Sequence, residues 1–344
     1  MRADFVPGHA GQTGRQTVAL AHPPTVAGFA SVVGKKEGDG PLAETFDLVN
    51  QDDTFGEKSW EKAESAMQRL ALSTALDKAG LPASRLDYIL AGDLLNQCIG
   101  TGFALRGQDV PFYGLYGACS TMAESLSLAA LLLDGAFGDY AAAMTSSHFC
   151  SAERQYRTPL EYGGQRTPTA QWTVTGSGCV ILSREGAGPR VTHVTTGKVV
   201  DKGIKDANNM GAAMAPAAYE TIKAHLEDLG RKPSDYDLIL TGDLGSLGKE
   251  ILLDLFHRDG VELPNLEDCG VLIYDAVTQD VHCGGSGCGC SAVVLTGLLL
   301  NGMNQGRWKR LLFCGTGALL SPTSTQQGES IPCICHAVAL EGQK

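Results

Sequence analysis

The stretch GACSTMAESLSLAALLLDG at residues 117–135 decides the fold, because the second half of the chain repeats it as GCGCSAVVLTGLLLNG at residues 287–302. Both stretches carry Cys-Ser at the head of a long apolar run. A helix that is apolar on all sides is typical of a protein interior. The repeat therefore predicts two buried helices, headed by Cys119 and Cys290.

The segments around these helices are repeated too. Each half has an amphipathic helix, an apolar strand that ends in Gly-Asp, the Cys-Ser helix and a second apolar strand. The helices lie at 65–81 and 218–233, the first strands at 87–94 and 235–244, and the second strands at 141–147 and 311–317. Apolar strands flanked by helices indicate a largely parallel sheet covered on both faces. We expect an internally duplicated α/β fold of five layers, αβαβα, with the Cys-Ser helices between two sheets.

The chain is expected to divide near the stretch GAGPR at residues 186–190, because glycine and proline mark loops. This places one half at residues 1–188 and the other at 189–344. Residues 1–17 are expected to form a flexible leader to the first half.

Composition limits the class of protein. The net charge of -11 disfavours nucleic acid as a partner. The eleven cysteines are expected to be free thiols in a reducing compartment, since no signal-peptide pattern precedes them. No apolar run approaches the ~18 residues that a membrane-spanning helix needs, so any membrane association is expected to be peripheral.

Cys119 allows three interpretations. The backbone N–H groups at a helix N-terminus can stabilise a thiolate, which makes Cys119 a potential nucleophile. The same N–H groups, at Cys119 and Ser120, can instead bind a carboxylate of a ligand. A small buried cysteine chosen for packing is the third possibility. The position between a strand and a helix, where α/β sheets place ligands, favours a pocket.

Other polar residues end neighbouring strands or lie near Cys119. Asp93 faces the same crevice or caps a turn. Ser147 and His148 end the strand that follows the first Cys-Ser helix, although a histidine there can equally be structural. Glu124 lies within the apolar helix, where a buried carboxylate needs a partner.

Metal and nucleotide sites fit the sequence poorly. Zinc or iron-sulfur ligand types occur at Cys283, Cys288, Cys290, Cys333, Cys335 and His336. Their spacing lacks the two-residue gap of a zinc knuckle, so we expect no metal site. The glycine-rich stretches contain neither the dinucleotide-binding pattern nor a phosphate loop.

Long strings across nearly the whole chain resemble the stage V sporulation protein AD family of spore-forming bacteria, thiolase-like proteins that bind dipicolinic acid. The strings are LAGDLLNQ, GACSTMAES, TSSHFCSAERQYR, EYGGQ, TVTGSG, MGAAMAPAA, DYDLILTGDL, DCGVLIY, GGSGCGCSAVV and TGALLSP. The resemblance implies a thiolase-like fold, which agrees with the duplicated architecture. It places Cys119 where condensing enzymes of this superfamily carry their catalytic cysteine.

Condensing enzymes also need a histidine, or a histidine and an asparagine, from the second half. In this chain those places are occupied by LTGDLGS at 240–246 and by GGSGCGC at 284–290. The resemblance therefore implies a protein that is not an enzyme and binds dipicolinic acid, as the free acid or its calcium chelate, for uptake into the developing spore. No other cofactor is implied. A condensing enzyme or acyltransferase that uses Cys119, with His148 or His282 as base, is the alternative, and a scaffold with a vestigial pocket is a third possibility.

A planar dicarboxylate needs hydroxyl and backbone donors. The residues expected to bind it are Asp93, Cys119, Ser120, Glu124, Ser147, His148, Gly284, Gly285, Ser286, Gly315 and Thr316. The resemblance also implies peripheral attachment to the inner membrane of the forespore and spore, beside other stage V sporulation A proteins. Such a role would connect the protein with spore germination. A homodimer is expected as for other thiolase-like proteins.

Overall fold

The computed structural model describes residues 11–156 and 166–342, and its strands form two duplicated halves of one sheet. The order β5-β4-β6-β8-β2 in the first half matches β11-β10-β13-β14-β9 in the second. The first half consists of β2 (Thr25–Val33), β4 (Tyr88–Gly92), β5 (Phe112–Gly114), β6 (Tyr140–Ser147) and β8 (Gly176–Ser183). The second consists of β9 (Arg190–Thr195), β10 (Leu238–Thr241), β11 (Leu266–Asp268), β13 (Arg310–Ala318) and β14 (Cys333–Glu341). The duplication expected from the sequence is confirmed.

The two halves join at a single paired position, Thr25 opposite Arg190. Short strands extend the sheet, with β1 (Thr17–Ala19) beside β9 and β3 (Leu48–Val49) beside β2. A separate pair is formed by β7 (Trp172–Thr173) and β12 (Gly285–Ser286). This parallel pair joins the halves a second time, close to the Cys-Ser helices.

The expectation of a largely parallel sheet is correct for only three strands of each half. β4 is parallel to β5 and β6, and β10 is parallel to β11 and β13. In contrast, β8 runs antiparallel to β6 and β2, as β14 does to β13 and β9. An apolar strand buried on both faces has the same sequence pattern in either direction, so the pattern did not distinguish them.

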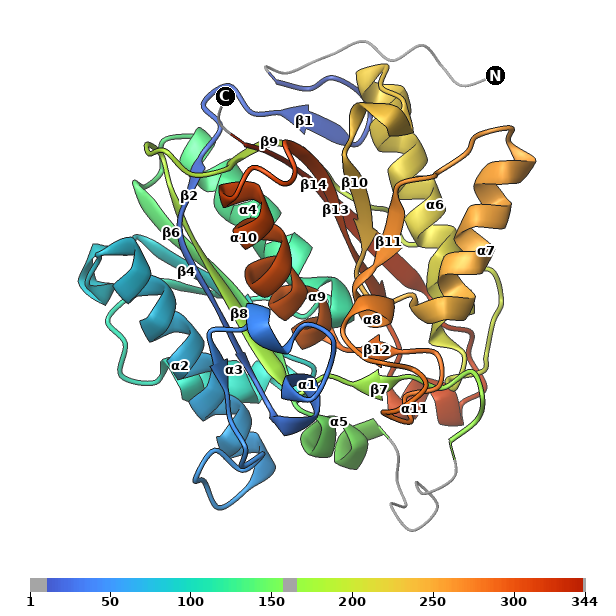
Figure 1. Ribbon diagram of the computed structural model, residues 1–344, viewed down its shortest axis with the longest axis horizontal. Coiled ribbons are helices and arrows are strands. Elements are labelled where there is room, and N and C mark those ends of the chain that lie inside the picture. The colour runs from blue at the N-terminus through green and yellow to red at the C-terminus, as the bar shows by residue number, and fades with distance from the viewer. Residues whose placement is uncertain (1–10, 157–165, 343–344) are drawn as a thin grey trace.

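Helices cover both outer faces and fill the centre, which gives the five expected layers (Figure 1). The outer helices are α2 (Trp60–Ala79) and α3 (Ile99–Leu105) on the first half, and α6 (Met210–Leu229) and α7 (Gly245–Arg258) on the second. The central helices are α4 (Thr121–Asp134), α9 (Cys288–Val294) and α10 (Leu300–Asn304). Short helices occupy loops: α1 (Lys35–Gly38), α5 (Phe149–Tyr156), α8 (Cys269–Leu272) and α11 (Pro322–Gln326).

The two long outer helices begin and end in the same way, which accounts for their equal length. Side chains of Ser59 and Asn209 cap their N-termini by accepting backbone N–H groups. Gly80 and Gly230 end them with φ values of 66° and 60°, a left-handed conformation that glycine adopts without strain. The duplication thus includes the residues that begin and end the long outer helix of each half.

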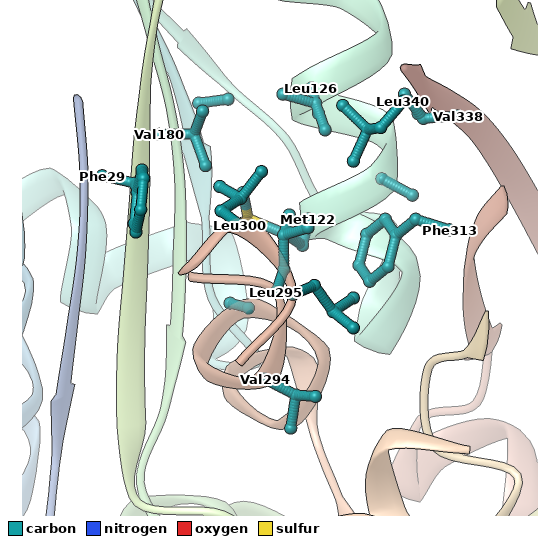
Figure 2. Packing of buried hydrophobic residues seen from close by; sticks show 14 of the residues in the cluster. Phe29, Met122, Leu126, Val180, Val294, Leu295, Leu300, Phe313, Val338 and Leu340 are labelled. Atoms are coloured by element: carbon teal, nitrogen blue, oxygen red, sulfur yellow. The ribbon is translucent and has the colours of Figure 1, made fainter. Parts of the chain in front are cut away.

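The core lies between the two halves of the sheet (Figure 2). Met122 and Leu126 of α4 pack beside Leu295, which follows α9, and beside Leu300 of α10. Residues of both half-sheets enclose them, among them Phe29, Val180, Phe313, Val338 and Leu340. Packing of the central helices therefore fixes the position of one half on the other.

The central helices differ from the expectation in two details. A 3-10 turn at Ala118–Ser120 precedes α4, and a π-helical segment at Leu295–Leu299 separates α9 from α10. In addition, Leu128 of α4 is 37% exposed, so an apolar side chain of this otherwise buried helix reaches the surface. An apolar pattern identifies a face that avoids water, and such a face can also lie at the surface.

Part of the predicted leader lies outside the described residues, which begin at residue 11. The rest of it contacts the second half, where the Asp228 carboxylate accepts the backbone N–H groups of Gln16 and Thr17. The division that we predict at residues 188 and 189 falls between β8 and β9. Within the described ranges, no helix combines the length and the apolar character that crossing a bilayer requires.

Candidate functional site

A cavity of about 250 Å³ lies where loops of the two halves meet. Its lining comprises Leu94, Ala118, Cys119, Ala152, Glu153, Tyr156, Thr173, Ala207, Asn208, Met210, Ser286, Ala318 and Leu320. These residues lie at or after the carboxyl ends of β4 and β13, in β7, β12 and α5, and at or just before the starts of α4 and α6. Ligands of α/β sheets bind in this kind of place. The volume lies below the ~300 Å³ at which pockets begin to accept drug-sized ligands, so a single-ring molecule fits best.

Among the other hollows, the two with volumes well above that of this cavity are less suited to a buried ligand. One of about 400 Å³ is lined mainly by charged side chains of α6 and the loop 198–202. The other, of about 550 Å³, lies between α2 and α3 and includes the exposed side chains of Ile99 and Phe103. Neither contains a residue predicted to bind the ligand. We therefore take the Cys119 cavity as the candidate site.

Cys119 enters the cavity from a tight turn at the start of α4. Ala118 has a φ of 51°, an uncommon conformation for a residue with a side chain, and it turns the backbone just before Cys119. The hydroxyl of Ser120 donates to the Gly117 carbonyl at 2.6 Å, so Ser120 stabilises the turn and does not line the cavity. Gly315 packs against this turn, where a Cβ would lie 2.6 Å from that of Ala123. Gly315 therefore allows β13 to approach α4 closely.

Asp243, at the end of β10, lies beneath Cys119 and was not among the residues predicted from the sequence. It is fully buried. Its Oδ2 accepts the Ser286 hydroxyl at 3.1 Å and the Gly287 backbone N–H at 3.0 Å. Its Oδ1 accepts the Thr316 hydroxyl at 2.8 Å, and the Cys119 thiol donates to the same carboxylate. The structure thus brings Cys119, Ser286 and Thr316 together around Asp243.

The electrostatics keep the Cys119 thiol protonated. Burial raises the pKa of Cys119 well above its ordinary value of 9, and the adjacent Asp243 carboxylate raises it further. Burial also raises the pKa of Asp243, to about 6, although hydrogen bonds from Cys119 and Thr316 partly oppose this shift. The thiol therefore retains its proton at neutral pH, while the carboxyl is ionised.

Asp93, which ends the equivalent strand of the first half, lies outside the cavity. It is fully buried, and its Oδ1 accepts the backbone N–H of Leu95 at 2.8 Å. Its Oδ2 accepts the N–H and the hydroxyl of Thr101 at 2.7 and 2.6 Å. The next residue, Leu94, does line the cavity. Asp93 therefore shapes the turn that carries Leu94.

Ser147 and His148 also lie away from the cavity lining. The Ser147 hydroxyl donates to the Val174 carbonyl at 2.7 Å and accepts the Gly289 N–H at 3.0 Å. One ring nitrogen of His148 lies 2.8 Å from the Asp53 carbonyl oxygen, and the other accepts the Cys150 N–H. Burial lowers the pKa of His148, so its ring is neutral at pH 7. Ser147 thus connects the first half to α9 of the second, whereas His148 connects loops of the first half.

Three further predicted residues support the site from outside it. Gly284 has a φ of 110°, and Gly285 pairs with Trp172, so both shape the loop that carries Ser286. Glu124 lies beneath Gly117, and its Oε2 is buried without a hydrogen-bond partner in the described structure. Burial raises the pKa of Glu124. Of the eleven predicted residues, only Cys119 and Ser286 line the cavity.

The cysteines and histidines of the described residues form no metal centre. All eleven cysteines are free thiols. Among residues 11–156 and 166–342, no cluster of three or more histidine, cysteine, aspartate or glutamate side chains is arranged to hold a metal ion.

The duplicated five-layer fold, with a cysteine at the head of the first central helix, defines a thiolase-like protein. Solved structures with this fold include 3-oxoacyl-[acyl-carrier-protein] synthase III from Aquifex aeolicus VF5, which is 14% identical with a TM-score of 0.56 and covers 92% of this chain and 99% of that chain. Cerulenin-bound OleA of Xanthomonas campestris is 15% identical with a TM-score of 0.59 and covers 93% and 96%. The tetronic acid condensing enzyme AbyA1 is 16% identical with a TM-score of 0.58 and covers 92% and 100%. This likeness shows the fold.

The particular family follows from a closer likeness. The family model of stage V sporulation protein AD (SpoVAD) matches residues 14–341. Stage V sporulation protein AD of Bacillus subtilis (strain 168) is 46% identical over 330 residues, which cover 96% of this chain and 97% of that protein. The chain belongs to the stage V sporulation protein AD family, and its role lies in sporulation.

Proposed function

We propose that this protein binds dipicolinic acid, pyridine-2,6-dicarboxylate, in the Cys119 cavity and releases it unchanged, for uptake into the developing spore. One observation carries the proposal: the cavity of about 250 Å³ is lined by residues of both halves and headed by a buried thiol that keeps its proton. It has room for a single aromatic ring, and it lacks an activated nucleophile. Such a site favours binding over turnover.

The lining suits a flat ring with polar groups on its rim. Leu94, Ala318 and Leu320 offer apolar contacts for the faces of the ring. Hydroxyl groups of Thr173 and Ser286, with the Asn208 side-chain amide, offer hydrogen-bond donors to its carboxylates. A few placed donors within apolar walls are typical of small-molecule sites.

Charge favours the calcium chelate as the transported form. Asp243, which is mostly ionised at neutral pH, lies directly beneath the cavity, where its Oδ2 accepts the hydroxyl of the lining residue Ser286. A free dicarboxylate would meet negative charge there, whereas its calcium complex is neutral. Calcium is in this proposal part of the cargo, since carboxylate oxygens are its usual ligands.

Acyl transfer is the second candidate function, and one observation favours it. Asp243 lies in the stretch where the resemblance leads one to expect the histidine, and Ser286 lies in the stretch where it leads one to expect the asparagine. Asp243 contacts both Cys119 and Ser286, so polar groups do surround the cysteine. However, Asp243 has a lower pKa than the thiol beside it, so it is a poor base for Cys119. Incubation with acyl-CoA, followed by intact-mass measurement, tests this candidate. An acyl adduct on Cys119 would establish it.

Titration calorimetry with dipicolinate, with and without calcium chloride, tests the proposal. Ala318→Leu adds side-chain volume to the cavity wall and should weaken binding by at least about tenfold, since overfilled sites exclude ligands. Cys119→Ala should weaken binding, whereas Cys290→Ala at the head of α9, outside the cavity, should not. Equal melting temperatures would show that each variant is folded. Absence of binding by the wild-type protein would reject the proposal and leave the scaffold alternative.

The proposal extends to partners and location. We place the protein at the inner membrane of the forespore, attached peripherally beside other stage V sporulation A proteins. A homodimer is supported by β5 at the end of the sheet, where all three residues are exposed. The equivalent strand of the second half, β11, is mostly buried.

A further inference from the structure

Asp243 is connected to the cavity by the side chains of Cys119 and Ser286, of which Ser286 carries the only hydroxyl in the lining that donates to it among the described residues. The hydroxyl of Ser286 lines the cavity and donates to Asp243 Oδ2 at 3.1 Å. The second hydroxyl on the carboxylate, that of Thr316, is buried and belongs to β13. A ligand carboxylate in the cavity would therefore compete with Asp243 for the hydrogen of Ser286.

The surroundings of Asp243 supply no positive charge among the described residues. From the start of α4, the Cys119 thiol faces it. From β11 and α8 come the Asp268 carboxylate and the Cys269 thiol. From α9 and β14 come the thiols of Cys288, Cys290 and Cys333. Burial raises the pKa of Cys269, Cys288 and Cys290 well above 9, and that of Cys333 to about 12, so all four remain neutral thiols.

The Asp268 carboxylate, which also lies near Asp243, already accepts hydrogen bonds at both of its oxygens. Asp268 accepts the Thr241 hydroxyl at 2.7 Å and the backbone N–H groups of Leu244 and Gly245 at 2.9 and 3.0 Å. It also caps α8 by accepting the Val271 N–H. It does not line the cavity, and among the described residues no hydrogen bond links it to Ser286. Asp243 is thus the carboxyl that a ligand at Ser286 affects directly.

We propose that Asp243 couples occupation of the Cys119 cavity by a free carboxylate ligand to the uptake of one proton, with Ser286 as the relay. This inference rests on the proposed function, since dipicolinate is the carboxylate ligand in question. When the cavity is empty, the Ser286 hydroxyl donates to Asp243. When the ligand enters, a proton from solvent binds Asp243 Oδ2, which then donates to Ser286 Oγ. The Ser286 hydrogen turns to the ligand carboxylate, and no covalent bond between heavy atoms forms or breaks.

The expected pH dependence has a definite sign. With its pKa near 6, Asp243 is mostly ionised at pH 7 when the cavity is empty. A bound anion raises that pKa further, because two negative charges in a buried site repel each other. Binding therefore takes up a proton above pH 6, and affinity falls as pH rises, by up to about tenfold per pH unit for one proton. Below pH 6 the carboxyl is already protonated, and affinity levels off.

The test is calorimetric titration of the full chain with dipicolinate in calcium-free buffer, between about pH 5.5 and 8.5, the range around the Asp243 pKa. Repeating each titration in phosphate and in Tris, whose heats of ionisation differ, counts the protons taken up. The wild-type protein should take up about one proton per ligand at pH 7.5, following single-site linkage. Asp243→Asn keeps the size of the side chain and should bind with no proton uptake and a flat pH profile.

Two further variants make the test decisive. Asp93→Asn alters the equivalent residue of the first half, which lies outside the cavity, and should keep the wild-type pH profile. Ser286→Ala leaves the Asp243 carboxylate in place and should reduce the pH dependence by removing the relay. This variant also serves if Asp243→Asn does not fold.

The possible failures are distinguishable. Binding by the wild-type protein without proton uptake would overturn the inference and leave the proposed function intact. If Asp243→Asn still takes up a proton on binding, another group is the proton acceptor, and the inference is also overturned. Absence of binding at every pH would overturn both.

Discussion

Asp93 and Asp243 end equivalent strands of the two halves, but they accept hydrogen bonds from different surroundings. Asp93 is held by Thr101 and by backbone N–H groups close to it in sequence. Asp243 is held by Ser286 and Thr316, which come from distant segments and converge beneath the cavity. The same Gly-Asp string therefore has a structural role in one half and a place at the candidate site in the other.

Asp93→Asn is expected to destabilise the fold and leave ligand binding unchanged. The amide replaces one acceptor oxygen by an N–H donor. This donor then faces the backbone N–H of Thr101 or Leu95, and the two donors cannot form a hydrogen bond with each other. An unsatisfied buried donor costs about 1–3 kcal/mol. Urea unfolding should show this loss, and calorimetry on the folded variant should give a dipicolinate affinity within about twofold of the wild type, a change below ~0.5 kcal/mol. A large loss of affinity with unchanged stability would return Asp93 to the ligand-binding residues.

The sequence predicted the fold because its signals are local and repeated. Apolar strands, caps at Ser59 and Asn209 and glycines at the helix ends depend on neighbours in the chain. The position of Cys119 was predicted for the same reason, since a strand, a turn and a helix follow one another there. Such features need no knowledge of tertiary contacts.

The sequence did not predict which residues make up the site, because these residues come together through contacts between segments far apart in the chain. Asp243 meets Ser286 across 43 residues and Thr316 across 73. His148 follows a strand near the cavity, yet it contacts the Asp53 carbonyl, 95 residues earlier, and is not among the residues that line the cavity. The duplication was the one available signal for Asp243, because it made this residue the counterpart of Asp93.

Glu37→Gln is expected to remove a pH-dependent loss of stability. Burial raises the pKa of Glu37 from 4.5 to about 7, although the Tyr274 hydroxyl and the Thr175 N–H donate to its carboxylate. Its Oε2 is buried without a hydrogen-bond partner in the described structure. The folded state therefore holds the proton more tightly than the unfolded state. The stability that this group contributes is complete below pH 4.5 and is lost as pH rises through 7.

The size of this effect follows from the pKa difference. A shift from 4.5 to about 7 corresponds to about 3 kcal/mol. Glutamine resembles the protonated acid, so Glu37→Gln should gain stability relative to the wild type between pH 5 and 8 and match it near pH 4. Urea unfolding of both proteins across this range measures the difference. Glu64 and Asp243 titrate in the same range in both proteins, so only the difference isolates Glu37. A constant difference at all pH values would contradict the assignment.

The Cys119 thiol is expected to react slowly with iodoacetamide. Its raised pKa leaves little thiolate at neutral pH, and it is only 7% exposed. Cys283 is more exposed and should react first, by at least about tenfold at pH 8, given that the thiolate is the reactive form. Peptide mass spectrometry over time measures both rates, with Cys283→Ser as the control for assignment. Bound dipicolinate should slow Cys119 further. Rapid alkylation of Cys119 below pH 8 would instead indicate an activated nucleophile and favour acyl transfer.

The β5 surface is expected to form the interface of a homodimer. Phe112 and Tyr113 of β5 are 42% and 52% exposed, and Tyr116 and Phe137 beside them are 49% and 68% exposed. Leu128 of α4 is 37% exposed, whereas Leu299, at the same distance in sequence from Cys290 as Leu128 from Cys119, is fully buried. An exposed edge strand has unpaired backbone groups that a second copy can satisfy through antiparallel pairing about a two-fold axis.

Tyr113→Lys should therefore shift the protein towards monomer, because a lysine on an edge strand opposes pairing. Sedimentation velocity at several protein concentrations measures the change. Val277→Lys is the matched control, since Val277 is 92% exposed and lies in the loop after α8, far from β5 in the sheet order, so its variant should remain dimeric. Cys119 heads α4, which packs against β4, the strand paired with β5, so loss of the dimer should also weaken dipicolinate binding if pairing holds α4 in place. A wild-type protein that sediments as a monomer at all concentrations would contradict the prediction, and the exposed aromatic residues would then be available to a different partner.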